Sequence, residues 1–76
     1  MSVYRPYVDG GYATEVIFVR VEDEYAFLKE HEDAEEIDVP VSELYVRGFE
    51  ELRDIPEGKI VEINAPYKLL KEKGLI

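Results

Sequence analysis

The sequence predicts a small α+β domain in which a mainly antiparallel sheet of three or four strands carries a C-terminal helix on one face. The chain has 76 residues, which leaves room for a single domain over 1–76. Short apolar segments rich in β-branched residues alternate with turn residues, as in strands. The last residues carry helix start and stop signals. An alternative is a small β-barrel-like meander that ends in the same helix.

The first strands are expected near the N-terminus. Residues 3–8 are predicted to form a short strand, and Pro6 would restrict it to a sheet edge because proline cannot donate to a ladder. Residues 9–11 read Asp-Gly-Gly, which is a tight-turn signal. The next strand, residues 14–22, contains an almost continuous apolar run in its middle. Such a run predicts a central strand that is covered on both faces over its first half.

The segment 23–34 is compatible with two structures. The sequence favours a helix, because Asp23 can cap its first turn and most residues that follow are good helix formers. The rival interpretation is a hairpin with the preceding strand, in which residues 22–24 form the turn and residues 25–29 form the second strand.

The middle of the chain predicts two further strands. Apolar residues alternate over Ile37–Val41, and Pro40 places this strand at a sheet edge or strand end. A second alternating segment covers Lys59–Ile63. Between them, three apolar residues with helical spacing precede Pro56 and predict a short helical turn: Phe49, Leu52 and Ile55.

The C-terminal segment has the strongest helix signals. Asn64 is the expected N-cap, and Pro66 lies in the first turn, where its missing N–H costs nothing. Gly74 fits the left-handed position after the helix, so that Leu75 can contact Leu70 in a Schellman-type closure. The residues expected to face the sheet are Tyr67, Leu69 and Leu70.

Composition excludes several functions. The chain has no cysteine, which removes disulfides, thiolate metal sites and cysteine nucleophiles. Its two serines lie in no nucleophile-elbow pattern, and phosphate-binding glycine loops are absent from the sequence. We therefore expect neither an enzyme nor a cofactor. The longest apolar run, Val16–Val19, is too short for a membrane span, and the start lacks signal-peptide features, so a cytoplasmic protein is expected.

Temperature adaptation is a further compositional prediction. The chain has no glutamine, one asparagine and one methionine, while glutamate is its commonest residue. Depletion of thermolabile side chains together with abundant glutamate is typical of thermophile proteins.

The distribution of charge is the most informative feature. The formal net charge is −9. Residues 22–38 hold nine acids and one base, a net charge of −8, whereas the other 59 residues sum to −1. Such a balance argues against binding to a phosphate backbone, so nucleic acid is not the expected partner.

We interpret this acidic stretch as the surface by which a protein-interaction or regulatory module recognises another protein with a basic surface. The tyrosine-rich N-terminus is expected to form a second contact or a homodimer surface, because tyrosine is common at interfaces. The predicted contact residues are Glu30, Glu32, Asp33, Glu35, Glu36, Tyr4, Tyr7 and Tyr12.

Two other functions remain open at the sequence level. On a helix, His31 and Glu35 would share one face, as would Glu32 and Glu36, and this set could hold a small ligand or a divalent cation. Its spacing matches no known metal motif, and solvated charge runs are far commoner, so we expect no metal site. The other alternative is a nucleic-acid module that uses the tyrosines and the C-terminal lysines.

Overall fold

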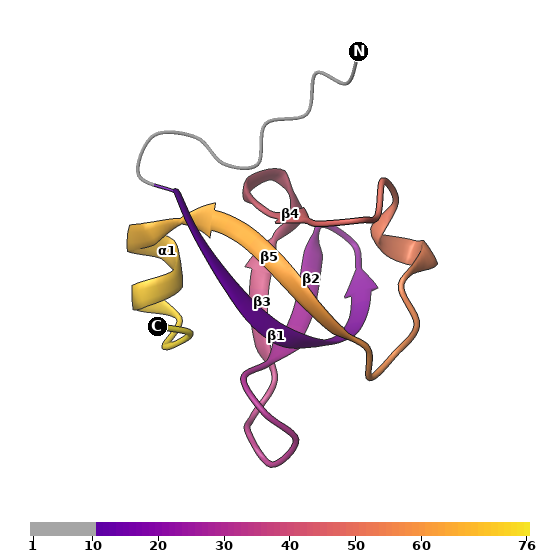
Figure 1. The fold of residues 1–76 in the computed structure, drawn as a ribbon, viewed down its shortest axis with the longest axis horizontal. Helices are drawn as coiled ribbons and strands as arrows, with labels where there is room; N and C mark the ends of the chain where they lie inside the picture. Colours follow the sequence, from indigo (N-terminus) through magenta and orange to yellow (C-terminus); the bar gives the residue numbers. More distant parts are fainter. Residues whose placement is uncertain (1–10) are drawn as a thin grey trace.

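The computed structural model describes residues 11–76 of the chain (Figure 1). Within this range the chain forms five strands, two short 3-10 helices and one α-helix. They are β1 Gly11–Glu22, β2 Tyr25–Lys29, β3 Ile37–Pro40, η1 Val41–Glu43, β4 Tyr45–Val46, η2 Leu52–Asp54, β5 Ile60–Pro66 and α1 Tyr67–Glu72. The predicted strand at residues 3–8 and the turn at Asp9-Gly10 lie outside the described residues.

All described strand pairs are antiparallel, and the strand order in the sheet is β3-β2-β1-β5-β4. The sheet stays unclosed, with β3 and β4 at its two edges. The α+β class with a C-terminal helix is thus confirmed, but the sheet has five strands rather than three or four. The sheet curls strongly, because the first half of the long β1 pairs with β5 and its second half pairs with β2 (Figure 1).

A β-bulge at Val19 explains the continuous apolar run in β1. Phe18 pairs with Leu28, but Arg20 pairs with Phe27, so Val19 is an extra residue in the ladder. Without it, regular alternation from Phe18 would turn Arg20 towards the core. The bulge instead leaves Arg20 on the outer face and turns Val21 inwards.

The segment 23–34 is not a helix, and the prediction of one was wrong. β1 and β2 form a hairpin whose two-residue turn is Asp23-Glu24, as the rival interpretation had it. Asp23 adopts a φ of 55°, a left-handed conformation that aspartate tolerates. Helix propensity was overridden because β2 lies between β1 and β3 and buries Ala26 and Leu28 completely.

The hydrophobic core lies inside the curled sheet. Its largest fully buried side chains come from all five strands and the helix: Phe18, Leu28, Ile63, Leu70, Val16, Val39 and Val46. The predicted strand at residues 37–41 is present as the edge strand β3. The predicted helical turn near Phe49 is present as η2, and Ile55 after it is buried.

The end of α1 is the Schellman closure that the sequence predicts. Gly74 has a φ of 81°, its N–H donates to the Lys71 carbonyl at 3.1 Å, and the Leu75 N–H donates to the Leu70 carbonyl at 2.9 Å. Leu70 and Leu75 are both buried in the core. Among the described residues, no helix is long and apolar enough to cross a membrane.

The start of α1 differs from the prediction in two respects. Asn64 is not the helix cap. β5 continues through Ala65, which pairs with Tyr12 on β1, and Pro66 takes the N-cap position. Tyr67 is not buried against the sheet and stays 46% exposed, whereas Leu70 is buried and Leu69 is partly buried against the core. Because β5 continues to Pro66, the helix begins only at Tyr67.

Candidate functional site

A hollow lies between the end of β1 and the segment that holds η1, β4 and η2. It has a volume of about 760 Å³. A second hollow of about 530 Å³ follows β1 back to Phe18 and shares Val21, Asp23, Leu52 and Arg53 with the first. The two hollows adjoin along these shared residues, and we call them together the β1–η2 groove.

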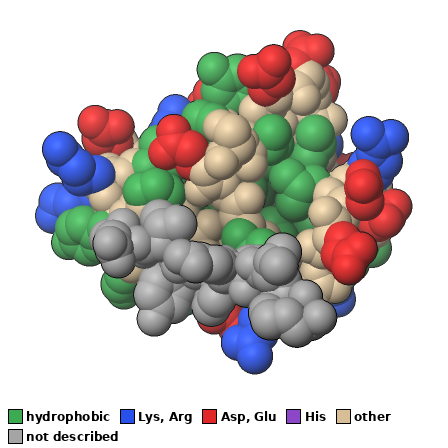
Figure 2. Space-filling model, turned by 90° about the horizontal axis from the view of Figure 1, so that it is seen from above, with side chains coloured by type: hydrophobic (Ala, Val, Ile, Leu, Met, Phe, Trp, Pro, Cys, Tyr) green, Lys and Arg blue, Asp and Glu red, His purple; other side chains and the backbone are tan. Residues whose placement is uncertain are grey.

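The floor of this groove is apolar because it is the accessible margin of the core. Five of the hydrophobic side chains that line it are only partly buried and pack against the core from the open side. They are Val21, Val41, Leu44, Phe49 and Leu52. In Figure 2, which looks onto the side that bears β4, hydrophobic side chains gather on the surface between acidic ones. Exposed apolar surface of this kind, rimmed by polar groups, is typical of interaction sites.

The rim of the groove is negative. Four carboxylates line it: Asp23 from the hairpin turn, Glu50 and Glu51 from the segment before η2, and Glu57 from the segment after η2. Two arginines, Arg20 and Arg53, line it as well. Arg53 lies 3.5 Å from Glu51, and both side chains are largely exposed. Within residues 11–76, Asp23 and Glu50 take part in no ion pair, so their charges are available to a ligand.

The acidic residues predicted as a contact surface lie elsewhere. Glu30, Glu32, Asp33 and Glu35 are exposed in the loop between β2 and β3, which projects from the body of the molecule (Figure 1). β2 separates this loop from Asp23, since the two lie at opposite ends of that strand. The acidic stretch of the sequence is thus divided between two ends of the molecule.

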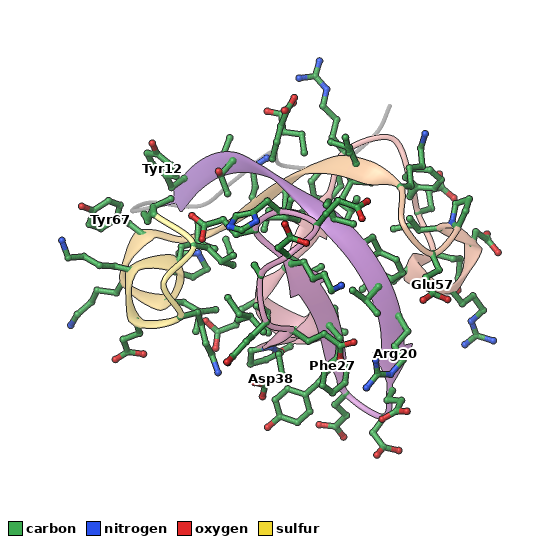
Figure 3. All side chains as sticks on the ribbon, turned by 90° about the horizontal axis from the view of Figure 1, so that it is seen from below. Tyr12, Arg20, Phe27, Asp38, Glu57 and Tyr67 are labelled. Carbon is green, nitrogen blue, oxygen red and sulfur yellow. The ribbon has the colours of Figure 1, made fainter. Side chains whose placement is uncertain are left out.

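Part of the acidic stretch is neutralised internally. Arg20 donates to Glu36 at 2.9 Å and to Glu22 at 3.3 Å, and its guanidinium lies 4.3 Å from the ring centre of Phe27 (Figure 3). The hydrogen bond to Glu36 is the main reason why the pKa of Arg20 is raised. Glu36 therefore binds Arg20 instead of facing solvent alone.

Asp38 on β3 has a partner as well. Its Oδ1 lies 3.6 Å from the Nζ of Lys73, which follows α1. This pair connects the edge strand to the end of the helix.

An aromatic pair joins the first strand to the helix. Tyr12 of β1 contacts Tyr67 of α1 edge to face, with ring centres 5.8 Å apart, and both rings are nearly half exposed (Figure 3). The Nζ of Lys71 lies 6.0 Å from the centre of the Tyr67 ring. Tyr4 and Tyr7, the other predicted contact residues, lie outside the described residues.

The arrangement expected for a cation is not formed. His31 and Glu35 lie in the β2–β3 loop and not on a helix, so the shared face on which that alternative depended is absent. Among residues 11–76, no three carboxylate or histidine side chains gather closely enough to hold a metal ion.

Sequence reasoning missed the β1–η2 groove because its walls come from segments 21–23 and 41–53, which only the fold brings together. Phe49 and Leu52 were predicted only as members of a short helical turn, and no local signal distinguishes a core residue from one at the core margin. Comparison with known proteins found no matching family model, no similar curated protein and no similar solved structure.

Proposed function

We propose that the protein is a non-catalytic interaction module that binds a positively charged segment of another protein in the β1–η2 groove. The observation that carries this proposal is the combination of an open apolar floor with a rim of four carboxylates and two arginines, each of which already lies next to a carboxylate. The floor supports binding of apolar side chains, and the rim supports selection of lysine or arginine beside them.

The acidic β2–β3 loop has a different role in this proposal. It is separated from the rim by the five residues of β2, or about 16 Å at 3.3 Å per residue. That distance exceeds the Debye length of about 8 Å at physiological ionic strength. The loop therefore attracts a cationic partner during its approach at low salt and adds little to the bound complex.

The test compares two charge-neutralised variants that each lose two carboxylates. The rim variant carries Asp23→Asn and Glu50→Gln, and the loop variant carries Glu32→Gln and Asp33→Asn. Asparagine suits position 23 because it tolerates the left-handed backbone there. The probe is a synthetic heptapeptide in which four lysines alternate with three valines, and its binding is followed by calorimetry.

The rim variant should bind the probe roughly three- to thirtyfold more weakly. It loses two exposed charge pairs with the peptide, and each is worth about 0.3–1 kcal/mol of binding free energy. The loop variant should stay within about twofold of the parent at physiological salt, because its charges are screened. An analogous peptide with glutamate in place of lysine should not bind. Equal losses in the two variants, or no binding of the lysine peptide to the parent protein, would refute the proposed site.

A further inference from the structure

The second half of β1 has a backbone edge that faces the β1–η2 groove. On one side, β1 pairs with β2 as far as Glu22. On the other side, pairing with β5 ends at Ile17, and the last bonds are those of Phe18 with Lys59 and Gly58, at 2.8 and 2.7 Å. From Val19 to Glu22, no backbone group of the described residues bonds to β1 from that side.

The hairpin register shows which backbone groups point to the open side. In an antiparallel hairpin with a two-residue turn, the pair next to the turn exchanges both hydrogen bonds, and here that pair is Glu22 and Tyr25. The next pair, Val21 and Ala26, is then of the other type. Val21 therefore directs its N–H and C=O away from β2, and its side chain lines both hollows of the groove.

We infer that a basic peptide binds the groove in extended form, as an additional strand along the Val19–Glu22 edge of β1. This inference rests on the proposed function and specifies its ligand. A strand directs alternate side chains to opposite faces. Apolar residues at every second position of the peptide would pack on Val21, Leu44 and Leu52. The lysines or arginines between them would extend towards the carboxylates of the rim.

Charge complementarity favours this occupant. Over both hollows, four of the six charged side chains are carboxylates. The other two are Arg20 and Arg53, and each already lies next to a carboxylate. An acidic or purely apolar strand would leave Asp23 and Glu50 without a counter-charge. An extended segment that alternates basic and apolar residues satisfies the edge, the floor and the rim together.

The test uses the alternating lysine–valine heptapeptide and three relatives of it. One has the same composition arranged as a block of lysines followed by a block of valines. The other two carry N-methyl groups on central backbone amides, one peptide at the valines and the other at the lysines. The methyl groups remove those hydrogen-bond donors without changing the charge. Binding to the parent protein is measured by calorimetry, and protection of the Val21 amide is followed by NMR hydrogen exchange.

Strand addition predicts that the block peptide binds about tenfold more weakly than the alternating one. N-methylation of one of the two alternating sets of amides should lower affinity at least about tenfold, and methylation of the other set should change it less than about threefold. The reason is that only alternate amides face the partner strand. The Val21 amide should become protected when the alternating peptide binds.

Three results would overturn the inference. Equal affinity of the alternating, block and methylated peptides would show that a basic peptide binds without forming a strand, and would leave the proposed function standing. No binding of any lysine peptide would remove the proposed function itself. A concentration-dependent dimer in sedimentation experiments that excludes the peptide would identify a second copy of the chain as the occupant of this edge.

Discussion

Replacement of Asn64 by valine should stabilise the protein. Asn64 lies in β5 and is only 5% exposed, and its side-chain oxygen has no hydrogen-bond partner among residues 11–76. It pairs across the sheet with Ala13 on β1 and Tyr45 on β4. The native strand therefore buries an acceptor without compensation, at a position where a β-branched apolar side chain is better suited.

The magnitude follows from the cost of such a group. A buried polar atom without a partner destabilises a protein by about 1–3 kcal/mol, and valine removes that atom at similar volume. We expect a gain of about 1–2 kcal/mol in the free energy of unfolding. Near the melting temperature this corresponds to a rise in Tm of about 4–8 °C per kcal/mol in a domain of this size.

Urea denaturation of the parent protein and the Asn64→Val variant, followed by circular dichroism, measures the change. The sign of the result is decisive. If Asn64 capped α1 as the sequence suggests, the substitution would instead cost about 1 kcal/mol. A less stable valine variant would therefore refute the assignment of Asn64 to the strand or show that its oxygen has a partner in solution.

The Asn64→Asp variant is the control. Burial disfavours the ionised carboxylate, which raises its pKa in the folded protein above that in the unfolded chain. Ionisation at neutral pH then favours the unfolded state, so this variant should be the least stable of the three. Its deficit relative to the parent should shrink as pH falls through the range in which the carboxyl becomes protonated.

Two further predictions concern the scaffold, and urea denaturation measures both. Gly74→Ala should lower the free energy of unfolding by about 1–2 kcal/mol, because the left-handed φ of 81° is unfavourable for alanine. The added Cβ would meet no atom within 4 Å, so the cost is that of the backbone alone. An unchanged urea midpoint would contradict the Schellman closure. Leu28→Ala should cost about 2–5 kcal/mol, since this side chain is fully buried. Leu52→Ala at the groove floor should cost clearly less and should weaken binding of the lysine–valine peptide; equal destabilisation by the two would place Leu52 in the core.

The parts of the fold that were predicted correctly depend on local chemistry. Gly74 ends α1 because few other residues adopt a positive φ at low cost, and this requirement is visible in the sequence. Pro40 restricts β3 to an edge because proline lacks the N–H that a central strand needs. Such signals act within a few residues and do not depend on the rest of the chain.

The errors occurred where local preferences were balanced. Residues 25–29 can form a helix or a strand, and pairing with β1 and β3 decides the matter by burying Ala26 and Leu28. Asn64 suits a helix cap, but continued pairing of β5 with β1 keeps it in the strand. Long-range hydrogen bonds and apolar burial outweigh a capping preference of about 1 kcal/mol.

The candidate site also combines features that the local sequence determines with features that only long-range pairing determines. The sequence by itself determined the acidic character of the protein, the termination of α1 and the edge position of β3, since these follow from individual side chains and their immediate neighbours. Only the tertiary structure decided that Asp23 and Glu50 flank one groove while the β2–β3 loop lies at the other end of β2. The physical reason is that proximity in a curled sheet is set by strand pairing between distant segments, which composition and local spacing do not specify.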